Sequence, residues 1–301
     1  MSSGDIRRSL RRRADALGLD FEQALQYYAI ERFLFRLSQT SWAEHLIVKG
    51  AVMFRVWDAA VARPTRDVDF LGRLQSTPEA IEAIVRECLA VEVGDDGLEF
   101  SDVIDVAEAM LDDRYPGVRV RIRGELAGAR FVLRLDIGAG DAVVPAPGWV
   151  DYPPLLDLPA PRILAYRPET AVAEKFESMV DLGLVNSRLK DFYDLWMLSG
   201  RLSFDGQTLA DASAATFRAR GTVLPTSAPA AVTAAFAEQG ATADMWRAYR
   251  SRLATSGIEA PAELAEVVSA VGDFVMPPAA TAARGEAFDA SWVADEGWMS
   301  P

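Results

Sequence analysis

Residues 63–70, Arg-Pro-Thr-Arg-Asp-Val-Asp-Phe, are the stretch of the chain that most constrains its fold. The Arg63-Pro64 dipeptide predicts a turn, and the residues that follow it predict a short strand. Because side chains on a strand repeat every second residue, Asp67 and Asp69 are expected on the same face. Two carboxylates side by side on one strand are candidate ligands for a hard cation.

Two further strands are predicted downstream, and the second one carries another acid. Residues 118–123 alternate between apolar residues and arginine, and residues 131–136 alternate apolar with mostly polar residues. Asp136 ends the second pattern on its polar face. Asp67, Asp69 and Asp136 would then form an oxygen-rich site that suits Mg²⁺ or Mn²⁺. A lone Asp-x-Asp pair also occurs as solvated acids at a strand end, so the surrounding sequence must decide.

A glycine upstream of the acids favours phosphate chemistry. Gly50 follows a short apolar run and precedes a predicted helix, so its backbone could approach a phosphate closely. A glycine turn, an Asp-x-Asp pair 17 residues later and a third strand-borne aspartate resemble the layout of polymerase-beta-like nucleotidyltransferases. Two other phosphate motifs are excluded, because Lys49 precedes the glycine and residues 138–140 lack a third glycine and a following helix.

Prolines near residue 160 divide the chain into two parts. The predicted fold class is α+β: residues 1–160 form a nucleotidyltransferase-like domain with a mixed sheet, and residues 161–275 form a helical domain that completes the active site. Residues 276–301 are predicted to be a flexible tail.

Composition excludes several function classes. Cys88 and His45 are the only cysteine and histidine, which excludes an intrachain disulfide, a thiolate zinc site and a Ser-His-Asp triad. A net charge of −13 argues against broad coating of nucleic acid. The chain shows no membrane-length apolar run and no signal peptide, so we expect a cytoplasmic protein without a membrane partner.

The ordered set of motifs resembles the AbiEii/AbiGii nucleotidyl transferase toxins, including the MenT group, over roughly residues 20–200. All three lysines of the chain fall within the segments that carry this resemblance. These segments are LIVKGAVMFR (46–55), RPTRDVDF (63–70), FVLRLDIGAGD (131–141) and ETAVAEKFESMVDLGLVNSRLKDFYDLW (169–196).

The resemblance implies a role for each matched residue. Asp67 and Asp69 are similar to the catalytic metal-binding pair, and Asp136 to a third carboxylate. Gly50 and Thr65 would contact the nucleotide, although Thr65 also suits an ordinary turn. One departure is Ala51, which stands where the family usually has a small polar residue or glycine.

Two further matched residues lie in the predicted helical domain. Lys175 would neutralise charge on the triphosphate, and Asp191 would position the nucleotide or the lysine; an exposed ion pair is the alternative for Lys175. Lys190 and Asp194 are four residues apart on a predicted helix, which favours a surface ion pair between them.

The resemblance implies a Mg-dependent enzyme that transfers a nucleoside monophosphate from an NTP to an RNA, the tRNA 3′ end above all, and so blocks translation. It also implies a toxin–antitoxin or phage-defence setting with an AbiEi-like antitoxin. Arg119, Arg121 and Arg123 would either bind RNA or form a solvated face. The alternatives are transfer to a protein or small-molecule hydroxyl, and nucleotide binding without catalysis.

Overall fold

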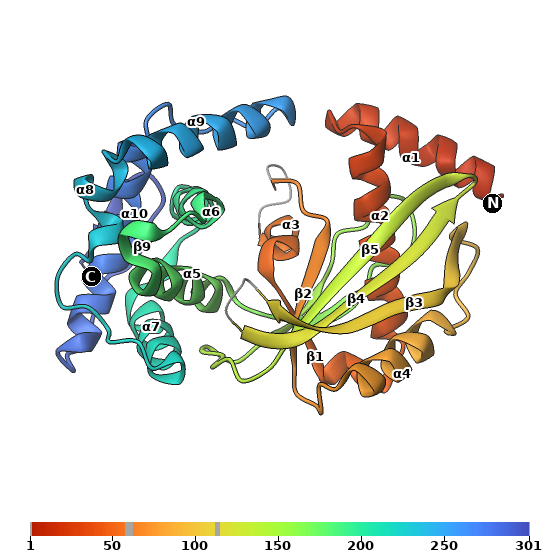
Figure 1. Ribbon diagram of the computed structural model, residues 1–301, viewed down its shortest axis with the longest axis horizontal. Coiled ribbons are helices and arrows are strands. Elements are labelled where there is room, and N and C mark those ends of the chain that lie inside the picture. Colours follow the sequence, from red (N-terminus) through yellow and green to blue (C-terminus); the bar gives the residue numbers. More distant parts are fainter. Residues whose placement is uncertain (1, 58–62, 112–114, 301) are drawn as a thin grey trace. The chain divides into compact units, whose positions relative to one another are not determined.

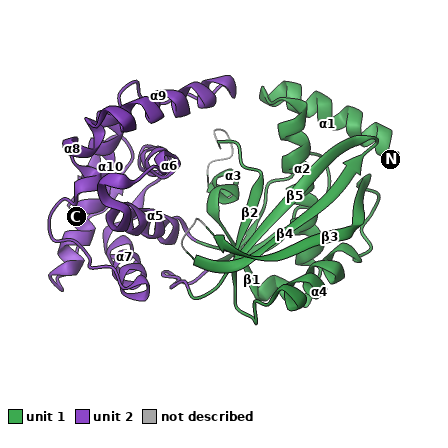
Figure 2. Ribbon diagram, in the orientation of Figure 1, with its two compact units in different colours: residues 1–140, 148–166 green, residues 141–147, 167–301 purple. Residues whose placement is uncertain are grey.

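The structure is a computed structural model that describes residues 2–57, 63–111 and 115–300 (Figure 1). The described chain divides into two compact units, which are coloured separately in Figure 2. We call residues 1–140 and 148–166 the sheet unit, and residues 141–147 and 167–301 the helical unit.

The division differs from the predicted boundary at residue 160 in two respects. The sheet unit continues to Tyr166, whose backbone N–H donates to the Val48 carbonyl oxygen at 3.0 Å. The short segment 141–147 belongs to the helical unit, because Thr170 Oγ1 donates to the Val144 carbonyl oxygen at 2.8 Å. Strand and hydrogen-bond partners distant in sequence set these limits, and a proline-rich stretch does not reveal them.

Seven strands build the main sheet of the sheet unit. They are β1 (Leu46–Lys49), β2 (Asp67–Gly72), β3 (Leu98–Leu111), β4 (Tyr115–Leu126), β5 (Ala129–Gly138), β6 (Gly148–Asp151) and β7 (Arg162–Ala165). Their order across the sheet is β3-β4-β5-β2-β1-β7-β6. β2 pairs with β5, and β1 with β7, in parallel, whereas the other pairs are antiparallel. This mixed sheet, together with its helices, confirms the predicted α+β class.

Helices of the sheet unit pack on one face of this sheet. They are α1 (Ser3–Leu17), α2 (Phe21–Ser38), α3 (Phe54–Trp57) and α4 (Pro78–Leu89). Apolar residues of α1, α2 and α4 join those of β2, β4 and β5 in one buried cluster. Asp20 caps α2, with its side chain accepting from the Gln23 backbone N–H at 2.7 Å.

The alternation in β4 and β5 decides which side chains the helices cover. Val120, Ile122 and Leu133 are fully buried in the apolar cluster. Their neighbours in sequence therefore point to the opposite side of the sheet, which we call the polar face. It carries Arg119, Arg121, Arg123, Arg134 and Asp136 from β4 and β5, and Asp67 and Asp69 from β2.

The helical unit contains six α-helices in its described part. They are α5 (Pro168–Leu182), α6 (Leu189–Ser199), α7 (Gly206–Arg220), α8 (Ala234–Ala237), α9 (Gly240–Thr255) and α10 (Leu264–Ala283). Three short strands form a second sheet in the order β10-β9-β8: β8 (Phe204–Asp205), β9 (Ser291–Val293) and β10 (Gly297–Met299). Within the described ranges, we find no helix with both the length and the apolar character needed to cross a bilayer.

The segment 276–301, predicted as a tail, contains regular structure in its described part. Helix α10 continues to Ala283, and β9 and β10 follow it. Trp292 is 8% exposed, and its Nε1 donates to the Ser199 carbonyl oxygen at 2.7 Å. The rings of Trp292 and Trp298 both pack against Phe274. Aromatic contacts with residues far away in sequence therefore order this segment, which composition alone does not indicate.

Candidate active site

Three aspartates lie on two adjacent strands of the sheet unit. In the parallel pairing of β2 with β5, Asp69 lies opposite Asp136, and Asp67 lies opposite Arg134. In the antiparallel pairing of β1 with β2, Asp69 lies opposite Lys49. Because paired residues on neighbouring strands share a face, the structure brings the three predicted metal-binding aspartates to the polar face.

Asp136 is held by a single arginine from the next strand. Arg119 lies opposite it in the β4–β5 pairing and donates from Nε to Oδ1 and from Nη2 to Oδ2, each at 2.7 Å. The hydrogen bonds to Asp136 raise the pKa of Arg119 above its usual value. Asp136 is only 8% exposed. Such a bidentate pair is among the strongest charge-assisted contacts, so the predicted metal ligand and the predicted RNA contact are here each other's partner.

This pairing bears on the predicted metal site. In the described parts of the chain, no group of three or more His, Cys, Asp or Glu side chains is arranged so that it could hold a metal ion. Both oxygens of Asp136 already accept hydrogen bonds from Arg119. The three aspartates can serve a cation together only if this guanidinium moves away.

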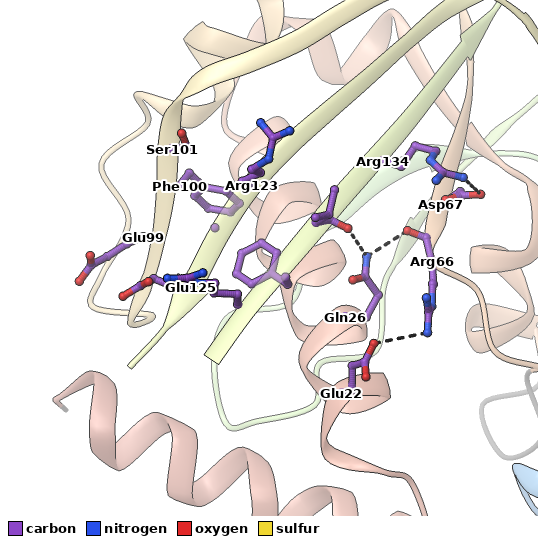
Figure 3. A pocket seen from close by; sticks show the side chains of 14 residues that line it. Glu22, Gln26, Arg66, Asp67, Glu99, Phe100, Ser101, Arg123, Glu125 and Arg134 are labelled. Atoms are coloured by element: carbon purple, nitrogen blue, oxygen red, sulfur yellow. Dashed lines mark hydrogen bonds and ion pairs between the residues drawn. The ribbon is translucent and has the colours of Figure 1, made fainter. Parts of the chain in front are cut away.

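Asp67 has one satisfied and one unsatisfied oxygen (Figure 3). Its Oδ2 accepts from Arg134 Nη1 at 3.2 Å. Its Oδ1 is buried and has no hydrogen-bond partner among the described residues. Burial raises the pKa of Asp67, and Arg134 offsets only part of this effect. A buried carboxylate oxygen without a donor fits a divalent cation, since Mg²⁺ and Mn²⁺ prefer oxygen ligands of this kind.

Gly50 touches Asp69 from the β1 side. It opens a 3-10 turn, Gly50–Met53, which leads into the short α3 helix. Its φ angle is +74°, and a Cβ atom built on it would lie 2.0 Å from Asp69 Oδ2. No side chain fits there unless Asp69 moves. Glycine therefore leaves the backbone in direct contact with the Asp69 carboxylate, at the place where the sequence predicts a nucleotide phosphate.

Two neighbouring predicted positions have local structural roles. Thr65 Oγ1 donates to the Asp67 carbonyl oxygen at 3.1 Å, so its hydroxyl holds the start of β2. Ala51, which departs from the family pattern, is buried with 7% of its surface exposed. A hydroxyl at position 51 would need a buried partner, whereas the alanine methyl group does not.

The three predicted RNA-binding arginines differ in their surroundings. Arg119 is half-buried and bound to Asp136, whereas Arg121 and Arg123 are exposed on the same face of β4. Arg123 pairs with Asp105 of β3 at 3.0 Å. Exposed guanidinium groups exchange partners at low cost, so Arg121 and Arg123 remain the better candidates for contacting a phosphate.

A second charged cluster lies in the helical unit. Lys175 of α5 donates from Nζ to Asp191 Oδ1 and to Asp194 Oδ2 of α6, both at 2.7 Å. Arg188 Nε donates to the other Asp191 oxygen at 2.9 Å. The side chains of Asp191 and Asp194 are 2% and 0% exposed, whereas that of Lys175 is 15% exposed. The exposed ion pair considered for Lys175 is therefore wrong.

The electrostatics of Asp191 follow from this cluster. Burial alone would raise its pKa, but the charges of Lys175 and Arg188 lower the pKa well below the usual range. The acid is thus ionised because two cations surround it in a buried position.

Sequence reasoning missed Asp194 as a member of the cluster. Asp194 is not the surface acid that the predicted pair with Lys190 assumed, because its side chain is fully buried and accepts from Lys175. A usable signal was present: Asp191 and Asp194 are three residues apart, so they share one face of a helix. Arg134, the partner of Asp67, was also missed as a site residue.

Comparisons with known proteins place the chain in a family. The family described as "Nucleotidyl transferase AbiEii toxin, Type IV TA system" matches residues 32–273. A search among curated proteins gave no match. A Helicobacter pylori protein described as a nucleotidyltransferase is 13% identical, with 88% of this chain and 96% of that chain covered and a TM-score of 0.49. JHP933 from Helicobacter pylori is 12% identical, with 75% and 90% covered and a TM-score of 0.39.

The two structural similarities are distant, and the family match is extensive. It includes β1, β2, β5, α5 and α6, the elements that carry Lys49, Asp67, Asp69, Asp136, Lys175 and Asp191. The resemblance predicted from the motifs is confirmed. The chain belongs to the AbiEii family of nucleotidyl transferase toxins of type IV toxin–antitoxin systems.

Proposed function

We propose that this toxin transfers a nucleoside monophosphate from an NTP to an RNA acceptor, the 3′ end of tRNA, and thereby blocks translation. One observation carries the proposal. Lys49, Asp69, Asp136 and Arg119 form a charged row across four adjacent strands, and the Gly50 backbone touches the carboxylate at its centre. A site of this kind suits phosphoryl chemistry, which depends on positioning and charge neutralisation.

Asp67, Asp69 and Asp136 would hold the divalent cation, Mg²⁺ or Mn²⁺. The unsatisfied Oδ1 of Asp67 supports this assignment, as does the position of Asp69 beside Asp136. When bound, the cation would neutralise phosphate charge and make an attacking hydroxyl more acidic. The arginines that now contact Asp67 and Asp136 would then lose their carboxylate partners and could contact phosphate oxygens instead.

The bond changes of the proposed reaction balance without another reactant. The acceptor hydroxyl oxygen forms a bond to the α-phosphorus while the bond from that phosphorus to the β-bridging oxygen breaks. Pyrophosphate leaves, and the hydroxyl proton passes to solvent. Gly50 would admit a phosphate close to the backbone, and the Thr65 hydroxyl would contact the nucleotide. Both positions adjoin the Asp67–Asp69 strand.

Lys175 of the helical unit would act on the triphosphate. Its ammonium group would neutralise charge on the triphosphate, and Asp191 would position it. Two buried carboxylates that each lie 2.7 Å from Nζ support this division of roles, because they fix the direction of a long, flexible side chain. A cation fixed in advance loses little entropy when it binds a phosphate.

Membership in a type IV toxin–antitoxin family implies an NTP substrate and an antitoxin partner. We propose an AbiEi-like antitoxin and action in the cytoplasm, where tRNA is available, without a membrane partner. Arg121 and Arg123 would contact the phosphate backbone of the acceptor. A chain with a net charge of −13 would bind RNA through a limited contact, and the acceptor end of tRNA offers one.

The test uses the full chain, a divalent cation, total tRNA and each α-labelled NTP in turn. We expect label to enter tRNA with the intact protein and not with the Asp67→Ala, Asp69→Ala double variant. A γ-labelled NTP should give no label, because its γ-phosphate leaves in pyrophosphate. Label with the double variant would contradict the assignment of the aspartates.

Absence of label in every tRNA lane would contradict an RNA acceptor. Labelled protein or small-molecule products would then identify a different hydroxyl as the acceptor. Binding of nucleotide without any product would indicate a noncatalytic member of the family.

A further inference from the structure

A cavity of about 690 Å³ lies beside the catalytic acids within the sheet unit (Figure 3). Asp67 and Arg134 lie at one end of its lining, and Glu99 and Glu125 lie at the other. The volume falls within the range of pockets that bind small molecules or single nucleotides. Its walls come from α2, the start of β2, and strands β3, β4 and β5.

The cavity opens on one particular side of the aspartate pair. Its described lining includes Asp67 but neither Asp69 nor Gly50. Gly50 continues from β1, and the cavity extends over β5 and β4, which lie on the other side of β2. A phosphate at Gly50 and a ligand in the cavity would therefore approach the aspartates from opposite sides.

This arrangement matches what in-line displacement requires. The attacking oxygen and the leaving pyrophosphate must lie on opposite sides of the α-phosphorus. Because the triphosphate is proposed to bind at Gly50, the cavity is left for the molecule that supplies the attacking oxygen.

The chemistry of the lining favours a nucleoside over a polyphosphate. Four arginines and four acids line the cavity, so their formal charges cancel. They are Arg66, Arg123, Arg130 and Arg134, with Glu22, Asp67, Glu99 and Glu125. A triphosphate would meet four carboxylates there. A terminal nucleotide offers one phosphate for the arginines and several hydroxyl or amino donors for the acids.

An apolar surface adjoins these charges. Val132 of β5 is 47% exposed, lines the cavity and lies opposite Arg123 in the β4–β5 pairing. Such a surface offers a base a place to pack, as apolar and aromatic side chains do in proteins that bind single-stranded RNA.

We propose that this cavity binds the 3′-terminal nucleotide of the RNA acceptor and directs its hydroxyl group toward Asp67. The proposal rests on the proposed function for its choice of acceptor. The base packs against Val132, and Arg123 and Arg130 contact the phosphate on the 5′ side of that nucleotide. The cavity is thus the acceptor subsite, and the Gly50 side is the NTP subsite.

The decisive variant is Val132→Trp, which fills the cavity from an exposed strand position. Its matched control is Val103→Trp, at a β3 valine that is 62% exposed and lies outside the lining. Arg130→Ala is compared with Arg162→Ala, an exposed arginine of β7. Thermal unfolding of each full-length variant establishes that it folds.

Three quantities are measured for every variant. They are the affinity for a short single-stranded RNA with a free 3′ hydroxyl, the affinity for a fluorescent NTP analogue, and kcat/KM for tRNA at saturating NTP. Val132→Trp should weaken RNA affinity and lower kcat/KM about tenfold or more, the loss of one well-packed contact. It should leave NTP affinity unchanged. Arg130→Ala should have a smaller effect in the same direction, and both controls should match the wild type.

Each outcome decides a separate question. Unchanged RNA affinity in Val132→Trp would overturn the acceptor subsite. A loss of NTP affinity in this variant would also overturn it, because the cavity would then bind the incoming nucleotide. Weaker RNA binding by Val132→Trp supports the acceptor subsite even if the wild type transfers no nucleotide. An absence of transfer by the wild type would reject the proposed reaction and leave the subsite standing.

Discussion

Asp67 in the sheet unit is a partly buried carboxylate and Asp191 in the helical unit is a fully buried one, and their pKa values shift in opposite directions. Burial raises the pKa of Asp67. Arg134 offsets only part of this rise, because it contacts the carboxylate through one hydrogen bond of 3.2 Å. The pKa of Asp191 is lowered despite burial, because Lys175 and Arg188 each contact it within 3 Å. Two cations thus compensate the charge of Asp191, whereas one arginine compensates the charge of Asp67 only in part.

The difference shows what each cluster can do. A bound cation would stabilise the ionised form of Asp67, which has a buried oxygen without a hydrogen-bond partner. The polar face is therefore suited to binding a cation reversibly. Lys175 lies between two buried carboxylates, and removing any one of these three charges would destabilise the protein. The α5–α6 cluster is therefore suited to holding a fixed charge. Variants of the two clusters test this contrast.

Lys175→Met should destabilise the protein by about 3–5 kcal/mol, because it leaves two buried carboxylates without their shared cation. Lys190→Met, at an exposed lysine of α6, should change stability by less than about 0.5 kcal/mol. Chemical denaturation of both variants measures the difference.

A triple variant sharpens this prediction. Lys175→Met combined with Asp191→Asn and Asp194→Asn removes all three charges, so part of the lost stability should return while nucleotide transfer stays absent. Equal stability of Lys175→Met and the wild type would contradict the fixed-charge account of this cluster.

Gly50→Ala should lower transfer by about a hundredfold, because its Cβ would displace Asp69 by more than an ångström. Gly128→Ala is a matched control with a φ of +83° and nothing within 4 Å of its Cβ. Both substitutions carry the cost of a left-handed backbone, about 1–2 kcal/mol, but only the first should affect kcat. The same loss of kcat in both variants would show that backbone strain, and not contact with Asp69, is responsible.

Asp67→Asn and Asp191→Asn should change stability in opposite directions at neutral pH. A carboxyl group with a raised folded pKa binds its proton more readily when folded, so the Asp67 charge reduces stability at neutral pH and this cost fades as pH falls. Asp191, with a lowered pKa, contributes stability above its unfolded pKa and loses it as pH falls through the folded value. Melting temperatures across pH should therefore show a small rise for Asp67→Asn and a fall for Asp191→Asn. A fall for both would contradict the contrast.

Local patterns were sufficient to predict the elements that carry the site. Alternation in residues 118–123 and 131–136 predicts β4 and β5, and the Asp-x-Asp spacing predicts that Asp67 and Asp69 share a face. The helix that carries Lys175 begins at Pro168 and ends just before Gly183, which are residue types that favour a helix start and a helix end. These features depend on residues close together in the sequence.

Pairings between distant residues could not be predicted in this way. Arg119 meets Asp136 because of the β4–β5 register, and Asp194 meets Lys175 because of the packing of α6 on α5. The last residues are ordered by contacts of Trp292 and Trp298 with Phe274. Register and helix packing are tertiary properties, and a single sequence does not encode them as a readable pattern.

The central claim, transfer to the 3′ hydroxyl of tRNA, is tested most directly by removing that hydroxyl. Periodate cleaves the terminal ribose diol and oxidises both of its hydroxyl-bearing carbons to aldehydes, so the treated tRNA has no 3′ hydroxyl. The full chain, with a divalent cation and its preferred α-labelled NTP, should label untreated tRNA and leave the treated tRNA unlabelled. Equal labelling of the two tRNA samples would contradict the account.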